Sequence, residues 1–287
     1  MRSKLCHIVL YFFTLVPAIA QMKVEVITKT VEDQFDYKSG FAIVVDGKSA
    51  TISIESWDKK EIGIEMKLIS KGLTKENAEK ELKYQKYVID EINETYVIRN
   101  YLLLPNGLEK LSTIQETEIR MYIPQNINIS IKNSFGNTLL KGVDGKVELE
   151  SKYGELVLND IIGTAQVNST FGDLKMKNFK GLLTADLEHT ATSIEGFSGN
   201  AYIKTNLGDM IWTDIHNIEK LKINAEKSDI NLGFSNHNLA SYYWQLKTKY
   251  GEIDFPEAGG EKKITYGNNQ GAPIEITTDF GKIIIEE

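Results

Sequence analysis

A short motif recurs through the second half of this chain and limits the folds that the chain can adopt. The motif has five positions: a small polar residue, a variable residue, an aromatic residue in most copies, glycine, and an acid in many copies. Examples are Ser151-Lys-Tyr-Gly-Glu155 and Ser169-Thr-Phe-Gly-Asp173. With Thr192 and Ser228 in the glycine place of two degenerate copies, the glycine positions are 136, 154, 172, 192, 208, 228, 251 and 281. Such a repeat predicts a stack of similar units.

Apolar residues alternate on both sides of each glycine position, as half-buried strands require. Five residues before these positions stand Ile131, Leu149, Val167, Leu187, Ile203, Ile223, Leu246 and Ile276. This register predicts coils of about 18–20 residues in which Leu149, Val167 and Leu187 share one interior column.

Each motif predicts a corner between two short strands. Glycine suits a corner because it reaches positive φ without a Cβ clash. The preceding aromatic residue can cover the edge of the core, and the Ser or Thr three before glycine can turn inward and bond local backbone. The predicted fold is therefore all-β: a single-stranded β-solenoid with one short helix. Hairpins forming a sandwich or barrel are the alternative, because regular turn signals suit them too.

The first half of the chain is also rich in strand patterns. Residues 50–66 are similar to another coil with a wider turn, and residues 74–82 predict a short helix that Thr74 can cap. Residues 87–92 and 95–104 predict a strand pair turning at Asn93-Glu94. We expect the helix to shield one open end of the stack, and we expect the glycine-rich residues 256–273 to form a surface loop.

The N-terminus predicts export. A basic start precedes the apolar run Leu5–Val16, and Pro17-Ala-Ile-Ala20 supplies a small-x-small cleavage site. We expect a signal peptide at residues 1–20, a β-rich part at 21–128 and solenoid repeats at 129–287. Cys6, the only cysteine, would leave with the signal peptide. No second long apolar run follows, so no membrane span is expected in the mature chain, whose place would be the periplasm, the outer surface or the medium.

The net charge of the chain disfavours two classes of binding partner. Without Arg2 and Lys4, 31 basic residues face 40 acidic ones. This excess of acid disfavours nucleic acid, which rewards clustered Lys and Arg, and an anionic membrane surface.

The acids after the motif glycines are candidate binding residues: Glu155, Asp173 and Asp209. Stacking would bring them into a column, and oxygen ligands suit Ca²⁺. Ordinary polar turns are the more typical interpretation, because Asn137, Ser193 and Lys282 interrupt the column. We therefore expect no metal and no cofactor.

Aromatic and histidine residues supply the remaining candidates. Tyr243 is expected to face solvent beside the inward Trp244, where it could contact a sugar or a protein. His189, His216 and His237 lack metal-ligand spacing. His189 falls on an inward position of the predicted repeat, which favours a buried structural imidazole. No pattern predicts catalytic residues, so we expect no enzyme.

Several segments resemble a known family. They are the turn at residues 54–62, the helix at residues 74–82, the lead-in at residues 118–127 and the Phe/Tyr-Gly-Asp/Glu corners. All are similar to exported bacterial domains of unknown function named "putative adhesin", which are common in the Bacteroidetes envelope. The resemblance covers about residues 40–287. It implies a β-solenoid-like fold and no established catalytic residues, so no functional residue is carried over.

These observations favour an exported, non-catalytic envelope or surface protein with an adhesin-like role. Its partner would be an unknown envelope protein or glycan. A carbohydrate-active β-solenoid enzyme is one alternative and would need a groove with convergent acids. A purely structural periplasmic spacer is the other.

Overall fold

The computed structural model describes residues 23–235, 239–256 and 258–286. The predicted signal peptide, its cleavage point, Cys6 and His237 lie outside the described residues. Strands dominate this part of the chain, joined by one α-helix and a short 3-10 turn at Leu239–Ser241. No helix in the described ranges has the length and apolar character needed to cross a membrane. The prediction of an all-β chain with one short helix is confirmed.

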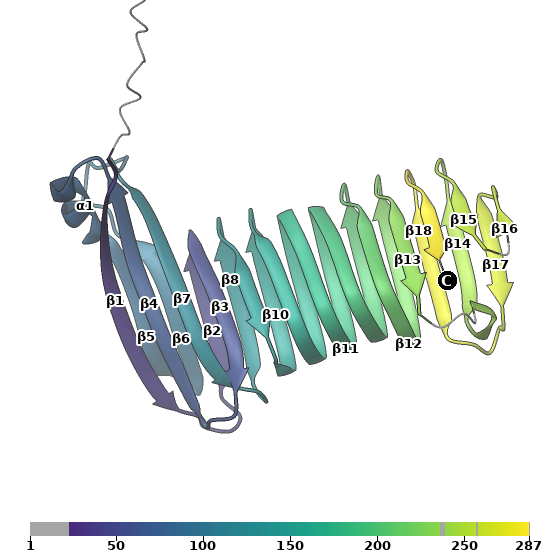
Figure 1. The fold of residues 1–287 in the computed structure, drawn as a ribbon, viewed down its shortest axis with the longest axis horizontal. Coiled ribbons are helices and arrows are strands. Elements are labelled where there is room, and N and C mark those ends of the chain that lie inside the picture. The colour runs from purple at the N-terminus through teal and green to yellow at the C-terminus, as the bar shows by residue number, and fades with distance from the viewer. Residues whose placement is uncertain (1–22, 236–238, 257, 287) are drawn as a thin grey trace, which may run out of the picture.

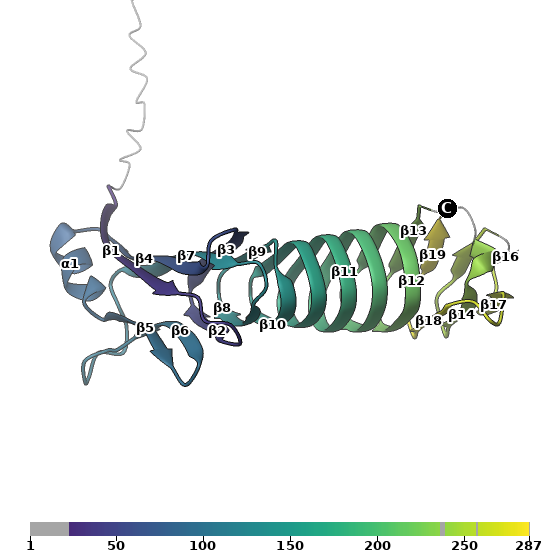
Figure 2. The same ribbon diagram turned by 90° about the horizontal axis from the view of Figure 1, so that it is seen from below.

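The strands wind around one elongated core as a row of stacked coils (Figures 1 and 2). The middle of the row consists of β8 (Asn128–Ser134), β9 (Thr138–Lys141), β10 (Asp144–Lys152), β11 (Glu155–Asn206), β12 (Met210–Glu226) and β13 (Ile230–Phe234). Strand β11 alone contains 52 residues, because it turns corners without losing its pairing. The buried core continues through residue 129, and the division of the chain there stays a prediction.

Successive coils pair in parallel and in register. Leu149 of β10 is the partner of Val167 in β11 and of Ile131 in β8. Hairpins folded across each glycine would instead pair these strands antiparallel. The parallel register of the middle coils therefore contradicts the hairpin alternative for this part of the chain.

The predicted register is wrong by two residues in the fourth coil. Met210 pairs with Thr192, which aligns Gly208 with Thr190 instead of Thr192. Ala185, not Leu187, therefore follows Val167 in the interior column. A slip of two residues keeps every side chain on its own face of the strand, so apolar alternation cannot detect it.

Side chains at equivalent places form columns inside the stack. One apolar column lies where each coil makes its second turn and contains Val143, Ile161, Phe179, Phe197, Ile215 and Phe234. The rings of Phe179 and Phe197 lie 5.6 Å apart and nearly parallel. A polar column contains Asn133, Ser151, Ser169, Thr205, Thr248 and Thr278, all buried. The prediction that the small polar motif residue turns inward is confirmed.

The C-terminal coils are not stacked in sequence order. They comprise β14 (Tyr243–Thr248), β15 (Ile253–Phe255), β16 (Ala258–Gly259), β17 (Lys263–Gly267), β18 (Pro273–Thr278) and β19 (Ile283–Glu286). Strand β18 lies between β12 and β14, and β19 lies between β13 and β15. The last coil of the sequence is therefore an inner coil, and the C-terminus lies short of the end of the stack (Figure 1).

The segment 256–273 does more than form a surface loop. Strand β17 pairs antiparallel with β14, and β16 pairs antiparallel with β15. The loop prediction is wrong for these residues. An unpaired strand edge invites association with other chains. Strands β17 and β16 cover the edges of β14 and β15, which would otherwise be exposed at the end of the stack.

The N-terminal end combines one more coil with antiparallel strands. Its elements are β1 (Glu25–Asp36), β2 (Ala42–Lys48), β3 (Ala50–Trp57), β4 (Glu61–Gly72), α1 (Lys75–Leu82), β5 (Gln85–Ile92), β6 (Thr95–Leu102) and β7 (Ile114–Pro124). Strands β2 and β3 form the coil that stacks on β8 and β9. The prediction of a coil at residues 50–66 is wrong, because β4 leaves the coil and pairs antiparallel with β1 and β7.

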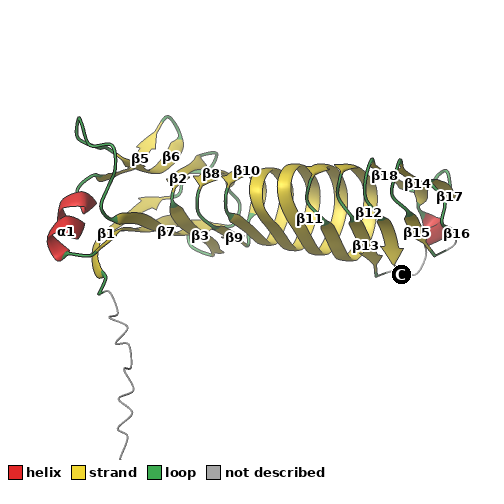
Figure 3. Cartoon of the chain, turned by 90° about the horizontal axis from the view of Figure 1, so that it is seen from above, coloured by secondary structure: helices red, strands yellow, loops and turns green. Residues whose placement is uncertain are grey.

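The helix and the first hairpin follow the sequence prediction. The Thr74 hydroxyl accepts a hydrogen bond from the Asn77 N–H at 3.3 Å, which caps α1. The helix covers the N-terminal end of the stack (Figure 3). Strands β5 and β6 are antiparallel, and both turn residues, Asn93 and Glu94, have positive φ.

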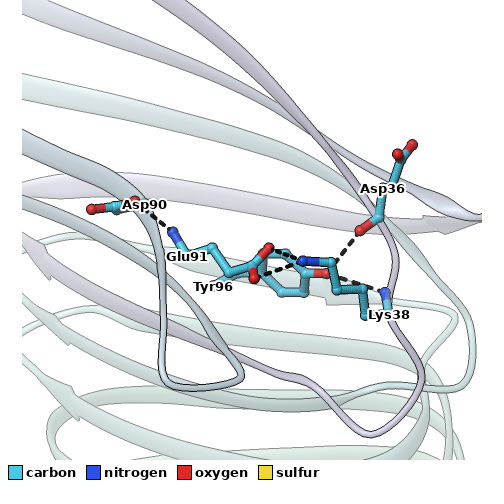
Figure 4. A network of polar contacts seen from close by, with 5 residues as sticks. All are labelled: Asp36, Lys38, Asp90, Glu91 and Tyr96. Atoms are coloured by element: carbon cyan, nitrogen blue, oxygen red, sulfur yellow. Dashed lines mark hydrogen bonds and ion pairs between the residues drawn. The ribbon is translucent and has the colours of Figure 1, made fainter.

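Two polar networks hold this end together. Lys38 donates to both carboxylate oxygens of Glu91 at 2.7 Å, and the buried Tyr96 hydroxyl donates to the Asp36 carbonyl (Figure 4). This hydrogen bond to Glu91 raises the pKa of Lys38. The loop after β1 is thereby fixed to the β5–β6 hairpin.

The second network surrounds Glu81, which is 8% exposed. Its carboxylate accepts from the backbone and hydroxyl groups of Ser112 and Thr113 at 2.6–3.0 Å. Burial alone would raise the pKa of Glu81, but these hydrogen bonds outweigh burial and lower the pKa. All these contacts anchor the segment before β7 to the helix, so Glu81 has a structural role.

Candidate binding surface

The residue before each motif glycine makes the corner of the coil. Phe135, Tyr153 and Phe171 have φ of 61°, 57° and 58°. Gly154 and Gly172 do not have positive φ, so the explanation that glycine supplies the left-handed conformation is wrong. A left-handed non-glycine residue costs about 1–3 kcal/mol, which the rest of the corner must offset.

The motif glycine is required by close approach between coils. A Cβ on Gly172 would lie 2.0 Å from the carbonyl oxygen of Gly154, and one on Gly154 would lie 2.1 Å from that of Gly136. A second column, Gly145, Gly163, Gly181 and Gly199, meets the same restriction at the other end of the strand.

The corner rings form a column along one edge of the stack. Phe135 and Tyr153 lie 5.0 Å apart, Tyr153 and Phe171 lie 5.1 Å apart, and both pairs are parallel to within 3°. These three rings remain 58%, 51% and 43% exposed. Stacked pairs contribute about 0.5–1.5 kcal/mol each, which offsets part of the corner strain. We call this set, with His189, the aromatic column.

His189 belongs to this column and is not buried. Its imidazole stacks on Phe171 at 4.6 Å, and its side chain is exposed. The prediction of a buried imidazole is wrong, because it followed the two-residue error in the fourth coil. Leu187 occupies the inward place instead, and Thr190, which stands at the glycine position, is also buried.

In several coils the side chain after the glycine position accepts a hydrogen bond from the backbone of the next coil. At this position the side chain of Asn137 accepts from the Glu155 N–H, and Asp209 accepts from the Asp229 N–H, both at 3.0 Å. Asp229 accepts in turn from the Lys282 N–H at 2.7 Å. A side-chain oxygen of one coil thus accepts a hydrogen bond from a backbone N–H of the next coil. These bonds continue the hydrogen bonding between coils around the corner.

The candidates Glu155, Asp173 and Asp209 lie along this edge beside the aromatic column. The Glu155 carboxylate pairs with Lys175 and raises the pKa of that lysine through a hydrogen bond. Asp173 is exposed on the next coil, and Ala191 separates it from Asp209. Within the described ranges no three His, Cys, Asp or Glu residues are grouped as a metal site.

Tyr243 lies apart from these acids. It begins β14, with Gly267 and Pro273 as its strand partners, and so stands at the end of the strand away from the Gly251 corner. Its ring is half-buried, and its hydroxyl accepts from the Gln245 amide at 3.2 Å. The structure does not bring Tyr243 together with the other candidates. His216 lies apart as well, with its Nδ1 3.0 Å from the Asp214 carbonyl oxygen.

Two exposed features were missed by the sequence analysis. The rings of Trp57 and Tyr122 stack on the outer face of β3 and β7. A shallow hollow of about 510 Å³ also crosses four neighbouring coils, and carboxylates line it from Asp186, Glu188, Glu226 and Asp279. Neither leaves a local sequence signal, because its residues come from separate coils.

Comparison with known proteins gives a family and a fold. A family model described as Toastrack DUF4097 matches residues 41–286. No curated protein matches the chain. Among solved structures, one described as a "putative adhesin" from Bacteroides fragilis is 13% identical with a TM-score of 0.50, and the match covers 90% of this chain and 97% of that one.

Two further structures match over similar lengths. One, described as a "putative lipid binding protein" from Parabacteroides distasonis, is 12% identical with a TM-score of 0.40, covering 90% of this chain and 96% of that one. The other, a "putative cell adhesion protein" from Clostridium sporogenes, is 15% identical with a TM-score of 0.22, covering 90% and 99%.

Proposed function

This chain belongs to the Toastrack DUF4097 family, and from that premise we propose that it is an exported, non-catalytic protein with an adhesin-like binding role at the cell envelope or surface. The adhesin names of similar structures agree with this role. Its partner is an envelope protein or a glycan.

The finer architecture that we assign is a single-stranded β-solenoid in the middle of the chain. The 18-residue offset between Asn137 Oδ1 and its partner at Glu155 is the coil length. The stack is closed at both ends by antiparallel strands, as described above. Such a stack holds its surface residues on regular strands, which position binding groups more accurately than loops do.

The aromatic column is the observation that supports the binding role most strongly. Three adjacent coils present rings that are 43–58% exposed, although the same corner accepts Leu207 and Lys227 in later coils. The corner thus does not require an aromatic ring. A continuous exposed apolar strip is typical of interaction surfaces.

The test uses a variant that keeps the stacking but changes the surface. His189 already stacks in the column at 4.6 Å, so Phe135→His, Tyr153→His and Phe171→His combined should preserve the corner. We expect retention on immobilised envelope extract to fall about tenfold, since three ring contacts are worth about 1.4 kcal/mol or more together. The melting temperature should change little.

A matched control replaces exposed apolar residues outside the column. Ile162→His with Ile211→His changes side chains that are 45% and 54% exposed, and retention should stay at the wild-type level. Equal retention by the column variant and the wild type would contradict a binding role for the column.

The carboxylates of the 510 Å³ hollow are the feature closest to the enzyme alternative. Under the proposed function, the purified mature chain releases no product from neutral or acidic polysaccharides. Turnover that Asp186→Asn or Glu226→Gln abolishes would establish an enzyme instead.

A further inference from the structure

We propose that the outer face of β1, β4 and β7 carries a carbohydrate subsite with Tyr122 as its aromatic wall, and that it takes a neutral pyranose ring. This inference deepens the proposed function and rests on it for the biological source of the sugar. Strands β8 and β10, which lead into the aromatic column, form one side of the coil. The site lies on the opposite side.

The wall is rigid and accessible. Tyr122 is 46% exposed, and its ring stacks on Trp57 at 5.4 Å with 21° between the planes. The Trp57 indole N–H donates to the Glu61 carbonyl at 2.8 Å, and the Lys59 ammonium lies 4.5 Å from the indole centroid. Since the indole is fixed from two sides, it holds the tyrosine ring in place.

Gly63 on the floor of the site has no side chain, which lets the aromatic wall pack closely over the strand. Gly63 is the strand partner of Tyr122 and of Gln34. A Cβ on Gly63 would lie 3.2 Å from the Trp57 indole, so glycine leaves room for the stacked rings. A hollow of about 380 Å³ remains beside Tyr122, which is within the range of small-ligand sites.

Hydrogen-bonding groups surround this hollow. Glu32 and Glu65 are direct strand partners on its floor, next to Gln34. A hydrogen bond from Lys67 lowers the pKa of Glu65, so Glu65 is a carboxylate at neutral pH. Like charges directly opposite on paired strands destabilise a sheet. Lys67 and Arg120 lie 2.9 Å and 4.0 Å from the Glu65 carboxylate and offset part of this repulsion. The two glutamates provide paired acceptors.

A pyranose fits this combination. One face of the ring is lined by C–H groups that pack against an aromatic face, and its rim carries hydroxyls that donate to carboxylate and amide oxygens. The carboxylates lining the hollow repel an anionic sugar. A protein partner would instead need a surface of about 800 Å², whereas this shallow hollow is lined by few residues and has the size of a sugar ring.

Tryptophan emission gives a direct test. Trp212 and Trp244 are fully buried, so an added ligand reaches only Trp57. Maltohexaose, cellohexaose, mannohexaose and chitohexaose are titrated into the purified mature chain, with oligogalacturonate as the anionic probe. We expect a saturable change with at least one neutral sugar and a weaker response to oligogalacturonate. Calorimetry then measures the affinity.

Variants locate the site. Tyr122→Ala should weaken binding of the responding sugar about tenfold, whereas Tyr122→Phe should retain most of it. Tyr202→Ala is the matched control, because Tyr202 is 38% exposed on the other sheet face and lies under Lys220; its affinity should match the wild type. Circular dichroism checks that each variant folds.

The outcomes separate this inference from the proposed function. No saturable response to any neutral sugar, a preference for oligogalacturonate, or wild-type affinity in folded Tyr122→Ala overturns the subsite. Retention on envelope extract that depends on the aromatic column would still support the proposed function in each case. If the column variant and the wild type are retained equally on envelope extract, the proposed function fails. The sugar titration still decides whether the subsite exists.

Discussion

Replacing Gly172 with alanine is expected to lower the free energy of unfolding by about 3 kcal/mol or more. The added Cβ would meet the Gly154 carbonyl oxygen at 2.0 Å, and neither backbone can move without breaking the ladder of the next coil. Chemical unfolding followed by circular dichroism measures the change. The effect is large because the obstacle is main chain and not the end of a flexible side chain.

Gly40 supplies the matched control. It has φ of 90°, but a Cβ added to it would meet nothing within 4 Å, so Gly40→Ala tests conformational strain alone and should cost about 1 kcal/mol. Asparagine tolerates left-handed φ, and Gly172→Asn should nevertheless be as damaging as Gly172→Ala. A cost for Gly172→Ala no greater than that for Gly40→Ala would contradict the close-approach explanation.

Placing a charge in the inserted C-terminal coil should have an effect at least as large. Ile283 is fully buried between Ile230 and Ile253. Ile283→Asp is expected to cost about 4 kcal/mol or more, because an unpaired carboxylate would lie in the core. Hydrogen exchange should show lost protection in both β13 and β15, because β19 is hydrogen-bonded to both of these strands.

The adjacent residue provides the control. Ile284 is half-buried on the outer side of the same strand, and Ile284→Asp should change stability by less than about 1 kcal/mol. Lost protection in β15 alone after Ile283→Asp would mean that the coil lies at the end of the stack, as sequence order suggests.

The sequence was sufficient to predict the coil but not its full register. Strand alternation has a period of two, so Thr190 and Thr192 were equally good partners for the glycine position. The ring column could have decided between them. His189 stands 18 residues after Phe171, as Phe171 does after Tyr153, whereas residue 191 is alanine.

Sequence could not predict the order of the coils at the ends. Leu221, Trp244 and Ile274 occupy equivalent places in three coils, and any of these coils can stack on any other by pattern alone. The structure places Ile274 between the other two. The last coil of the sequence thereby gains pairing on both sides, and β16 and β17 cover the free edges of β15 and β14.

The candidate site was predicted only in part. Glu155, Asp173 and Asp209 do lie along one edge, but the role of the position was missed. Asn137 does not interrupt the column, because its amide oxygen makes the same contact to the next coil as the Asp209 carboxylate. An uncharged amide oxygen can therefore replace a carboxylate in this contact.

The sugar subsite could not be predicted from local patterns. Trp57 and Tyr122 are separated by the whole β4–β6 segment, and they meet because β3 and β7 pair in parallel. Gly63 joins them from an antiparallel strand. Sites of this kind depend on how the end strands pair, which the repeat itself does not specify.

Oxidation of two cysteine pairs tests the parallel coil register, on which the aromatic column and the corner contacts depend. The mature chain should contain no other cysteine, since Cys6 precedes the predicted cleavage point. Glu148 and Gln166 are strand partners, at a Cα separation of about 5 Å that suits a disulfide. Glu148→Cys with Gln166→Cys should therefore cross-link readily. A hairpin across Gly154 would instead bring Glu148 opposite Asn159. Cross-linking of Glu148→Cys with Asn159→Cys, and none between positions 148 and 166, would contradict the stack.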